Sequence, residues 1–253
     1  MNVLARAISA EMLKLKRTLA LWMVLIAPLV VVVLLFLQIY MQDVPKKQSL
    51  PGDEAWLRLG NSVTSLWGFL MLPLFITLEA ALLGGLEHGE KQWKQLFALP
   101  VPRWTIYTAK LLVCLALIAV STVILWAGTI AAGLILQQVR PEIGNLGSVP
   151  WATMLRMAML TWLAAWLIIS LQTWVSLRWR SFPLAVGVGM SGTVVGFIVM
   201  QSEKWGKFYP WALPLTTMAG EGKNMSFAVT YGIIGGIIVG IIGCWEMTRR
   251  DVL

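Results

Sequence analysis

Long runs of apolar residues dominate the chain, and short polar segments separate them. A helix crosses the core of a bilayer with about 20 residues, and runs of that order occur at 19–40, 63–86, 106–137, 154–175, 183–200 and 227–245. The runs are continuous, whereas the strands of a membrane barrel alternate apolar and polar residues over roughly 10 positions. The pattern therefore predicts an all-α integral membrane bundle of six transmembrane helices.

Composition agrees with this class. Of the 253 residues, 58% are hydrophobic and 13% are charged, proportions that are not typical of a water-soluble domain. The first run follows Lys14, Lys16 and Arg17, exceeds the apolar core of a signal peptide and has no small-residue cleavage site after it. We expect it to stay as an uncleaved anchor. The connections are too short for a separate soluble module, so we expect residues 1–253 to form a single transmembrane domain.

The positions of Lys and Arg predict the orientation. Twelve of the 20 lie on one side of the six spans: Arg6, Lys14, Lys16, Arg17, Lys91, Lys94, Arg103, Lys110, Arg178, Arg180, Arg249 and Arg250. The other eight share their side with six of the acidic residues. Both termini are therefore expected in the cytoplasm. Because the basic residues are divided among helix ends, we expect no nucleic-acid binding.

The residues that usually bind metals or form disulfides are scarce. His88 is the only histidine, and the two cysteines, Cys114 and Cys244, both lie near cytoplasmic ends of spans. A reducing compartment keeps such thiols free. We expect neither a disulfide nor a metal site.

A Gly189-Met190-Ser191-Gly192 sequence in the fifth run matches the G-x-S-G of rhomboid proteases. A nucleophilic Ser191 would need a base within hydrogen-bond reach. His88 lies at the end of the second run, whereas Ser191 lies about eight residues, or some 12 Å, into the fifth. The sixth run, where a rhomboid carries its histidine, has none. A rhomboid-like intramembrane serine protease is thus the least favoured alternative.

One acidic residue, Glu79, falls inside the second run, six residues after Pro73. A charged group at the bilayer centre costs at least about 2.5 kcal/mol and commonly marks a bundle interior or a water-filled path. Glu79 is therefore a candidate for the transport path. A residue that reaches toward the headgroups or pairs with a neighbour is the other interpretation.

Glycines recur at four-residue spacing in the last two runs, which places them on one helix face and favours close helix packing. These glycines are Gly192, Gly196, Gly232, Gly236 and Gly240.

The connection between the second and third runs, 87–105, is the densest polar segment. Trp93, Leu96 and Phe97 follow one another at i, i+3 and i+4 among Lys and Gln residues, which predicts a short amphipathic helix. Pro100 and Pro102 end it, and the third span follows. Such a helix can lie on lipid headgroups or enter a groove of a partner.

The chain resembles a known family at this point. The residues that carry the resemblance are Glu87, Lys94, the run Leu99-Pro100-Val101-Pro102-Arg103, Tyr107 and Lys110-Leu111-Leu112. They look like a segment of bacterial type-2 ATP-binding-cassette permeases, particularly the branch associated with lantibiotic self-protection and bacitracin-type resistance. Glu11, Lys14, Lys16-Arg17 and Pro28 resemble that branch's amphipathic N-terminal helix and first span.

The resemblance implies a permease subunit of an exporter in the bacterial cytoplasmic membrane, with no catalytic activity of its own. Its substrate would be a peptide antibiotic, a drug or a lipid-like amphiphile, as in antibiotic resistance or immunity. The connection would couple it to separate ABC ATPase subunits, which bind ATP and Mg²⁺, and a second permease chain, identical or related, would complete the transporter. The implied coupling residues are Glu87, Glu90, Lys91, Trp93, Lys94, Leu96, Phe97, Pro100 and Arg103.

The residues agree with that division of labour. A nucleotide site needs G-x-x-x-x-G-K-[ST], and the two Gly-Lys pairs, at 206 and 222, are followed by Phe208 and Asn224. The second alternative is an ATP-independent transporter or membrane accessory protein that binds a partner through the same connection.

Overall fold

The computed structural model describes residues 3–16, 18–41, 52–88, 102–140, 147–179, 181–202, 204–217 and 223–249, without the side chains of residues 52, 53, 87, 88 and 223. The described chain is helical throughout, with short turns between helices. In order, the first elements are α1 (Val3–Leu15), α2 (Leu19–Met41), α3 (Gly52–Leu66), the π-helix η1 (Trp67–Met71), α4 (Leu72–His88) and α6 (Arg103–Val139). They are followed by α7 (Trp151–Ala164), α8 (Trp166–Arg178), α9 (Phe182–Val199), η3 (Gly206–Phe208), η4 (Pro210–Ala212), α10 (Leu213–Thr216) and α11 (Lys223–Arg249).

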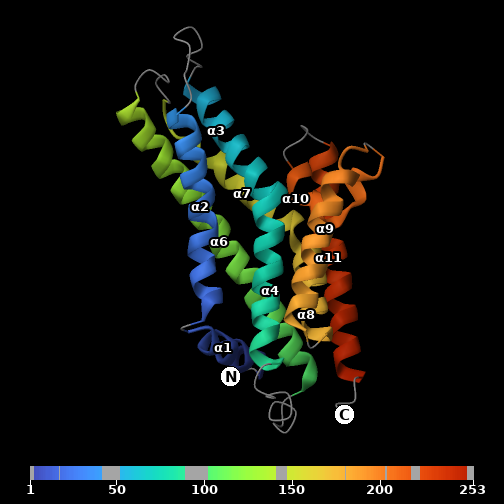
Figure 1. Ribbon diagram of the computed structural model, residues 1–253. Coiled ribbons are helices and arrows are strands. Elements are labelled where there is room, and N and C mark those ends of the chain that lie inside the picture. Colours follow the sequence, from blue (N-terminus) through green and yellow to red (C-terminus); the bar gives the residue numbers. More distant parts are fainter. Residues whose placement is uncertain are drawn as a thin grey trace.

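The prediction of six membrane-spanning helices is confirmed within the described residues. The spans are Leu19–Met41, Glu54–Leu86, Arg103–Val139, Trp151–Arg178, Phe182–Val199 and Asn224–Arg249. They run side by side, and α1 and the last turn of α11 lie at the same end of the bundle (Figure 1). An even number of crossings produces this arrangement.

The predicted start of the second span, residue 63, is wrong. The helix begins at Gly52, and the candidate span at Glu54. Hydropathy missed this part because one face of α3 is polar, although its buried face carries Trp56, Leu59 and Val63. Residues 52–61, which fall between the first two predicted spans, belong to this amphipathic helix.

The core lies between α2, α4, α6 and α8. Along α2 the buried residues Ala20, Val24, Val31 and Leu35 recur at intervals of four or seven positions, and α2 packs on α6. The opposite side of α2 exposes apolar residues such as Trp22, Leu29 and Leu37. This apolar face lies on a helix long enough to cross a membrane.

Helix α11 packs against α8 and α7 at very close range. A Cβ atom on Gly232 would lie 2.6 Å from the carbonyl oxygen of Ala164, where α7 gives way to α8. At the α1 end, Glu246 of α11 accepts hydrogen bonds from Arg178 and from the Trp174 indole of α8. Small residues along most of the helix and a polar contact near its end hold α11 on the bundle.

The second span is interrupted by η1. The backbone N–H of Leu72 donates to the carbonyl oxygen of Trp67, five residues earlier. Pro73 follows directly, and because proline has no backbone N–H, it cannot bond to the carbonyl of Phe69 as an α-helix requires. The sequence weakens the helix at the place where the π-turn forms.

The segment after α9 folds into the short turns η3, η4 and α10 at the end of the bundle opposite α1 (Figure 1). Tyr209 donates to the carbonyl oxygen of Gly192 at 2.7 Å, and the turns pack on α9, α11 and η1. This end of the bundle is closed by aromatic and proline residues that fold back on the spans.

Candidate functional site

A buried ion pair joins α1 to α6. Lys110 Nζ donates to Glu11 Oε2 at 2.6 Å, and Lys14 Nζ donates to Glu11 Oε1 at 2.8 Å. The side chain of Lys110 is 1% exposed and that of Glu11 is 5% exposed. Lys110 also lies 3.5 Å from the carbonyl oxygen of Leu83 in α4. One ammonium group thus links three helices.

The electrostatics of this junction favour the charged carboxylate. Burial disfavours a charge on Glu11 and by itself raises its pKa, but the positive charges and hydrogen bonds of Lys110 and Lys14 outweigh burial and lower the pKa below its ordinary 4.5. Glu11 is therefore ionised at neutral pH. The α1 helix is fixed on the bundle by a charge pair rather than only by apolar contact.

Glu79 of α4 lies inside the protomer and not on its surface. It is 0% exposed, and neither carboxylate oxygen has a hydrogen-bond partner among the described residues. Thr77 of the same helix and Gln172 of α8 are further buried polar residues. A Cβ atom on Gly189 of α9 would collide with both of these side chains.

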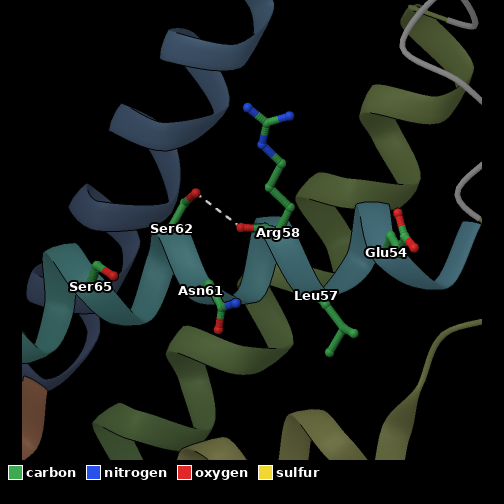
Figure 2. Close-up of a pocket in the computed structure, with 6 residues that line it drawn as sticks. All are labelled: Glu54, Leu57, Arg58, Asn61, Ser62 and Ser65. Carbon is green, nitrogen blue, oxygen red and sulfur yellow. Dashed lines mark hydrogen bonds between the residues drawn. The ribbon is translucent and has the colours of Figure 1, made fainter. Parts of the chain in front are cut away.

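A polar face runs along α3, near the end of the bundle opposite α1. The face borders a shallow groove of about 600 Å³. Figure 2 shows the six residues that line this groove, all from one helix: Glu54, Leu57, Arg58, Asn61, Ser62 and Ser65. All except Leu57 are exposed. The hydroxyl of Ser62 donates to the carbonyl oxygen of Arg58 at 3.0 Å, and the guanidinium extends away from the helix (Figure 2). A candidate membrane span thus exposes polar groups on one side.

Comparison with known protein families decides the identity of this bundle. The model of the ABC-2 family transporter protein matches residues 7–196, which is 190 of the 253 residues. The chain belongs to the ABC-2 transporter family. It is a multi-pass membrane protein and a permease component of an ABC transporter, and membership implies association with an ABC ATPase subunit. The chain matches no curated protein and no solved structure.

In this ABC-2 permease most of the predicted coupling residues lie outside the described part of the chain: Glu90, Lys91, Trp93, Lys94, Leu96, Phe97 and Pro100. Glu87 belongs to the last turn of α4, and Arg103 begins α6. Lys110 lies in the second turn of α6, seven residues after Arg103, and Leu83 lies in α4, four residues before Glu87. Two members of the junction are therefore near in sequence to the helix ends that flank the predicted coupling segment.

The predicted packing glycines lie at close approaches within the protomer. A Cβ atom would lie 2.5 Å from Trp211 at Gly192 and 3.4 Å from Tyr209 at Gly196, so α9 receives the folded-back turns. At Gly236 it would lie 2.8 Å from the Trp166 backbone and at Gly240 3.1 Å from Leu111. Ser191 is exposed on α9. Its neighbour Gly192 packs against Trp211. Among the described residues, no hydrogen bond joins Ser191 to a side chain that could act as a catalytic base.

Two features of the site were missed from the sequence. Glu11 and Lys110 were both noted, but their pairing joins positions 99 residues apart, which no local pattern reveals. The polar face of α3 could have been predicted from the sequence, because polar residues recur there at helical spacing: Glu54, Arg58, Asn61 and Ser65. A hydropathy window averages that face with the apolar one and conceals it.

Proposed function

We propose that this ABC-2 permease is an exporter subunit that moves an amphiphile outward, driven by ATP and Mg²⁺ bound in separate ATPase subunits. The observation that carries the proposal is the three-helix junction of Glu11, Lys110 and the Leu83 carbonyl. It ties together α4 and α6, the two helices that enter and leave the predicted coupling segment. Force applied to that segment would reach both helices and α1 together.

The mechanism follows from this linkage. When two ATPase subunits close on ATP, each displaces the coupling segment bound to it. The segment 89–101 is covalently continuous with α4 and α6, and the buried Glu11–Lys110 pair makes α1 follow them. Tightly packed helices move as rigid bodies, in the manner of hinge and shear transitions. The close contact of Gly84 with the Ser176 carbonyl passes the movement from α4 to α8.

The polar face of α3 supports a transport path shared by two permease chains. Polar side chains that face lipid are unfavourable, and in membrane proteins they usually face a bundle interior or water. In a single protomer Glu54, Arg58 and Asn61 face outward. A second copy of this chain, or a related one, would cover that face and leave a polar path between the two. A guanidinium, a carboxylate and an amide beside apolar helices suit an amphiphile with a charged head.

The orientation belongs to the same proposal. The α1 end carries Lys14, Arg103, Arg178 and Arg249, and the excess of basic residues there favours the cytoplasmic side. The α3 face and the turns η3, η4 and α10 would then lie on the outer side. The lantibiotic and bacitracin branch remains our preferred group within the family, on the residues that resemble it.

The proposal is tested by purification of the permease together with its ABC ATPase subunit. The wild-type chain should bring down the ATPase and stimulate its hydrolysis of ATP. Trp93→Asp should remove that stimulation because it places a charge on the apolar face of the predicted coupling helix, while the bundle still elutes as a folded species. Trp205→Asp is the matched control, since Trp205 is exposed at the opposite end. Equal stimulation by wild type and Trp93→Asp would overturn the coupling role.

Two further measurements separate the alternatives. An ATP-independent transporter would move substrate without any ATPase in the vesicle. A serine protease would lose activity in Ser191→Ala, whereas the exporter should keep its transport in that variant because Ser191 is an exposed side chain of α9.

A further inference from the structure

The two charged side chains on the polar face of α3 have no partner within the protomer. Glu54 and Arg58 are one helical turn apart, a spacing at which a carboxylate and a guanidinium can pair on the same helix. Here they do not, because the guanidinium extends away from Glu54 (Figure 2) and neither side chain forms an ion pair among the described residues. Both are exposed. The face therefore presents one negative and one positive charge to whatever covers it.

The rest of the polar face is uncharged, and it extends toward the apolar part of the span. Asn61, Ser62 and Ser65 are exposed, and their amide and hydroxyl groups both donate and accept hydrogen bonds. Ser65 lies inside the apolar run 63–86, within a candidate membrane span. Polar groups turned toward lipid are unfavourable at that level. A second polar protein surface would satisfy these groups better than lipid does.

This combination of groups is complementary to itself. A two-fold symmetric interface brings one patch against the same patch of a second copy, so each charge and each donor must find its counterpart within that patch. Glu54 supplies the anion for Arg58, and the amide and hydroxyl groups can donate to one another. A patch for a partner of one charge sign would carry an excess of the opposite sign. The described side chains of this face carry no such excess, which favours a second copy of the chain as the partner.

The symmetry of the proposed transporter sets the level of the contacts. Two permease chains with the same orientation in the membrane are related by an axis along the membrane normal, so their α3 helices run in the same direction. Glu54 and Arg58 then differ in height by four residues, or about 6 Å. Because side chains on a helix lean toward its N-terminus, the long Arg58 side chain extends toward the level of Glu54 in the second copy. Each helix supplies one anion and one cation, so the contact forms twice.

We propose that the polar faces of α3 from two copies of this permease meet and form reciprocal Glu54–Arg58 ion pairs that close the outer mouth of the transport path. The proposal rests on the exporter function, in which two permease chains enclose the path and this end is the outer one. The α3 helix belongs to the same candidate span as α4, Glu54–Leu86, and α4 leads into the predicted coupling segment. A rigid-body displacement of this span separates the two α3 helices and opens the mouth.

Charge reversal in two differently tagged copies tests the reciprocal pairs. Full-length chains with Glu54→Arg carry only cations at these two positions, and chains with Arg58→Glu carry only anions. Expressed together without the ATPase, the two variants should co-purify at least about fivefold better than either variant with itself, because opposite charges replace like charges in both contacts. An ion pair within one helix cannot give this result. Lys204→Glu reverses an exposed charge two residues before η3 and should leave co-purification at the wild-type level.

Cross-linking in the complete transporter tests whether the contact opens. With a short bis-maleimide, Asn61→Cys should form covalent dimers in membranes without nucleotide, and these dimers should be lost when ADP–vanadate is trapped. Lys204→Cys is the matched control, since it places an exposed thiol at the same end but away from α3, and it should give no more dimer than the wild type. The wild type sets the background, with Cys114 buried and Cys244 half-buried in α11.

The outcomes separate this proposal from the exporter function. If the mixed variants co-purify no better than each variant with itself, the reciprocal pairs are wrong. If two wild-type copies fail to co-purify while the ATPase binds and is stimulated, a related chain covers the face, and the second copy is wrong although the exporter stands. If Asn61→Cys cross-links equally with and without trapped nucleotide, closure of the mouth is wrong. If the copies pair through α3 but no ATPase binds, the interface stands and the exporter function fails.

Discussion

Lys110 and Glu11 form an ion pair of 2.6 Å between the second turn of α6 and the N-terminal helix α1, and both side chains are almost fully buried. The pair lies where α4 and α6 approach the connection that is predicted to bind the ATPase. Moving two charges out of water has a large desolvation cost, so an apolar contact could have attached α1 at a lower cost in free energy. A charge pair instead specifies one position for α1 on the bundle.

Loss of Lys110 should destabilise the bundle strongly. In Lys110→Met the carboxylate of Glu11 stays buried without its main partner, and a broken buried pair costs about 3–5 kcal/mol. The free energy of unfolding, measured by titration with SDS in mixed micelles, should fall by that amount. Lys14→Met is the matched control, because Lys14 contacts the same carboxyl group but its side chain is 30% exposed, so its loss should cost about 0–1 kcal/mol.

The double variant Glu11→Gln with Lys110→Met should recover part of the loss. With both charges removed no buried ion is left unpaired, so the double variant should be more stable than Lys110→Met alone. A double variant at least as unstable as the sum of the single ones would mean that the two side chains act independently.

The contribution of the pair should depend on pH. The lysines lower the pKa of Glu11 below 4.5, so the folded protein binds its proton less readily than the unfolded chain. The stabilisation is then fully present above pH 4.5 and is lost as the pH falls through the lower, folded pKa. The difference in melting temperature between wild type and Glu11→Gln should therefore be constant from pH about 7 to about 5 and should narrow toward pH about 3.

Gly84 should not tolerate a methyl group. A Cβ atom there would lie 2.7 Å from the carbonyl oxygen of Ser176, so Gly84→Ala should push α4 and α8 apart and cost about 1–3 kcal/mol. At Gly187 nothing lies within 4 Å of such an atom. Gly187→Ala should be neutral or should stabilise the helix by up to about 1 kcal/mol. Similar melting temperatures for the two variants would contradict the close approach.

The two faces of α3 should respond differently to substitution. Trp56 is 0% exposed in a cluster with Leu59 and Trp126, so Trp56→Ala should lower the free energy of unfolding by about 3–5 kcal/mol. Arg58→Ala, on the exposed face, should change it by no more than about 0.5 kcal/mol. If the face lines the path, Arg58→Ala should alter the export of a charged amphiphile from vesicles at unchanged stability. Unchanged export for every substrate tested would remove α3 from the path.

Much of the fold could be predicted because lipid imposes a simple requirement. Every backbone polar group in a bilayer must be satisfied within its own helix, so a long apolar run such as 106–137 implies a span, and the structure has one at Arg103–Val139. The same reasoning failed at α3. A helix with a polar face has low mean hydropathy, so the apolar run did not reveal that this helix begins at Gly52.

The sequence by itself determined the class of this protein, the number of its spans and the segment between α4 and α6 that resembles a coupling helix. It also placed a carboxyl group, Glu79, in a span. Only the tertiary structure decided that Glu11 pairs with Lys110, because helix packing and not chain proximity brings positions 99 residues apart together. Only the structure decided that Glu79 lies inside the bundle, because α2, α6, α8 and α9 pack around α4 and leave none of its described side chains exposed.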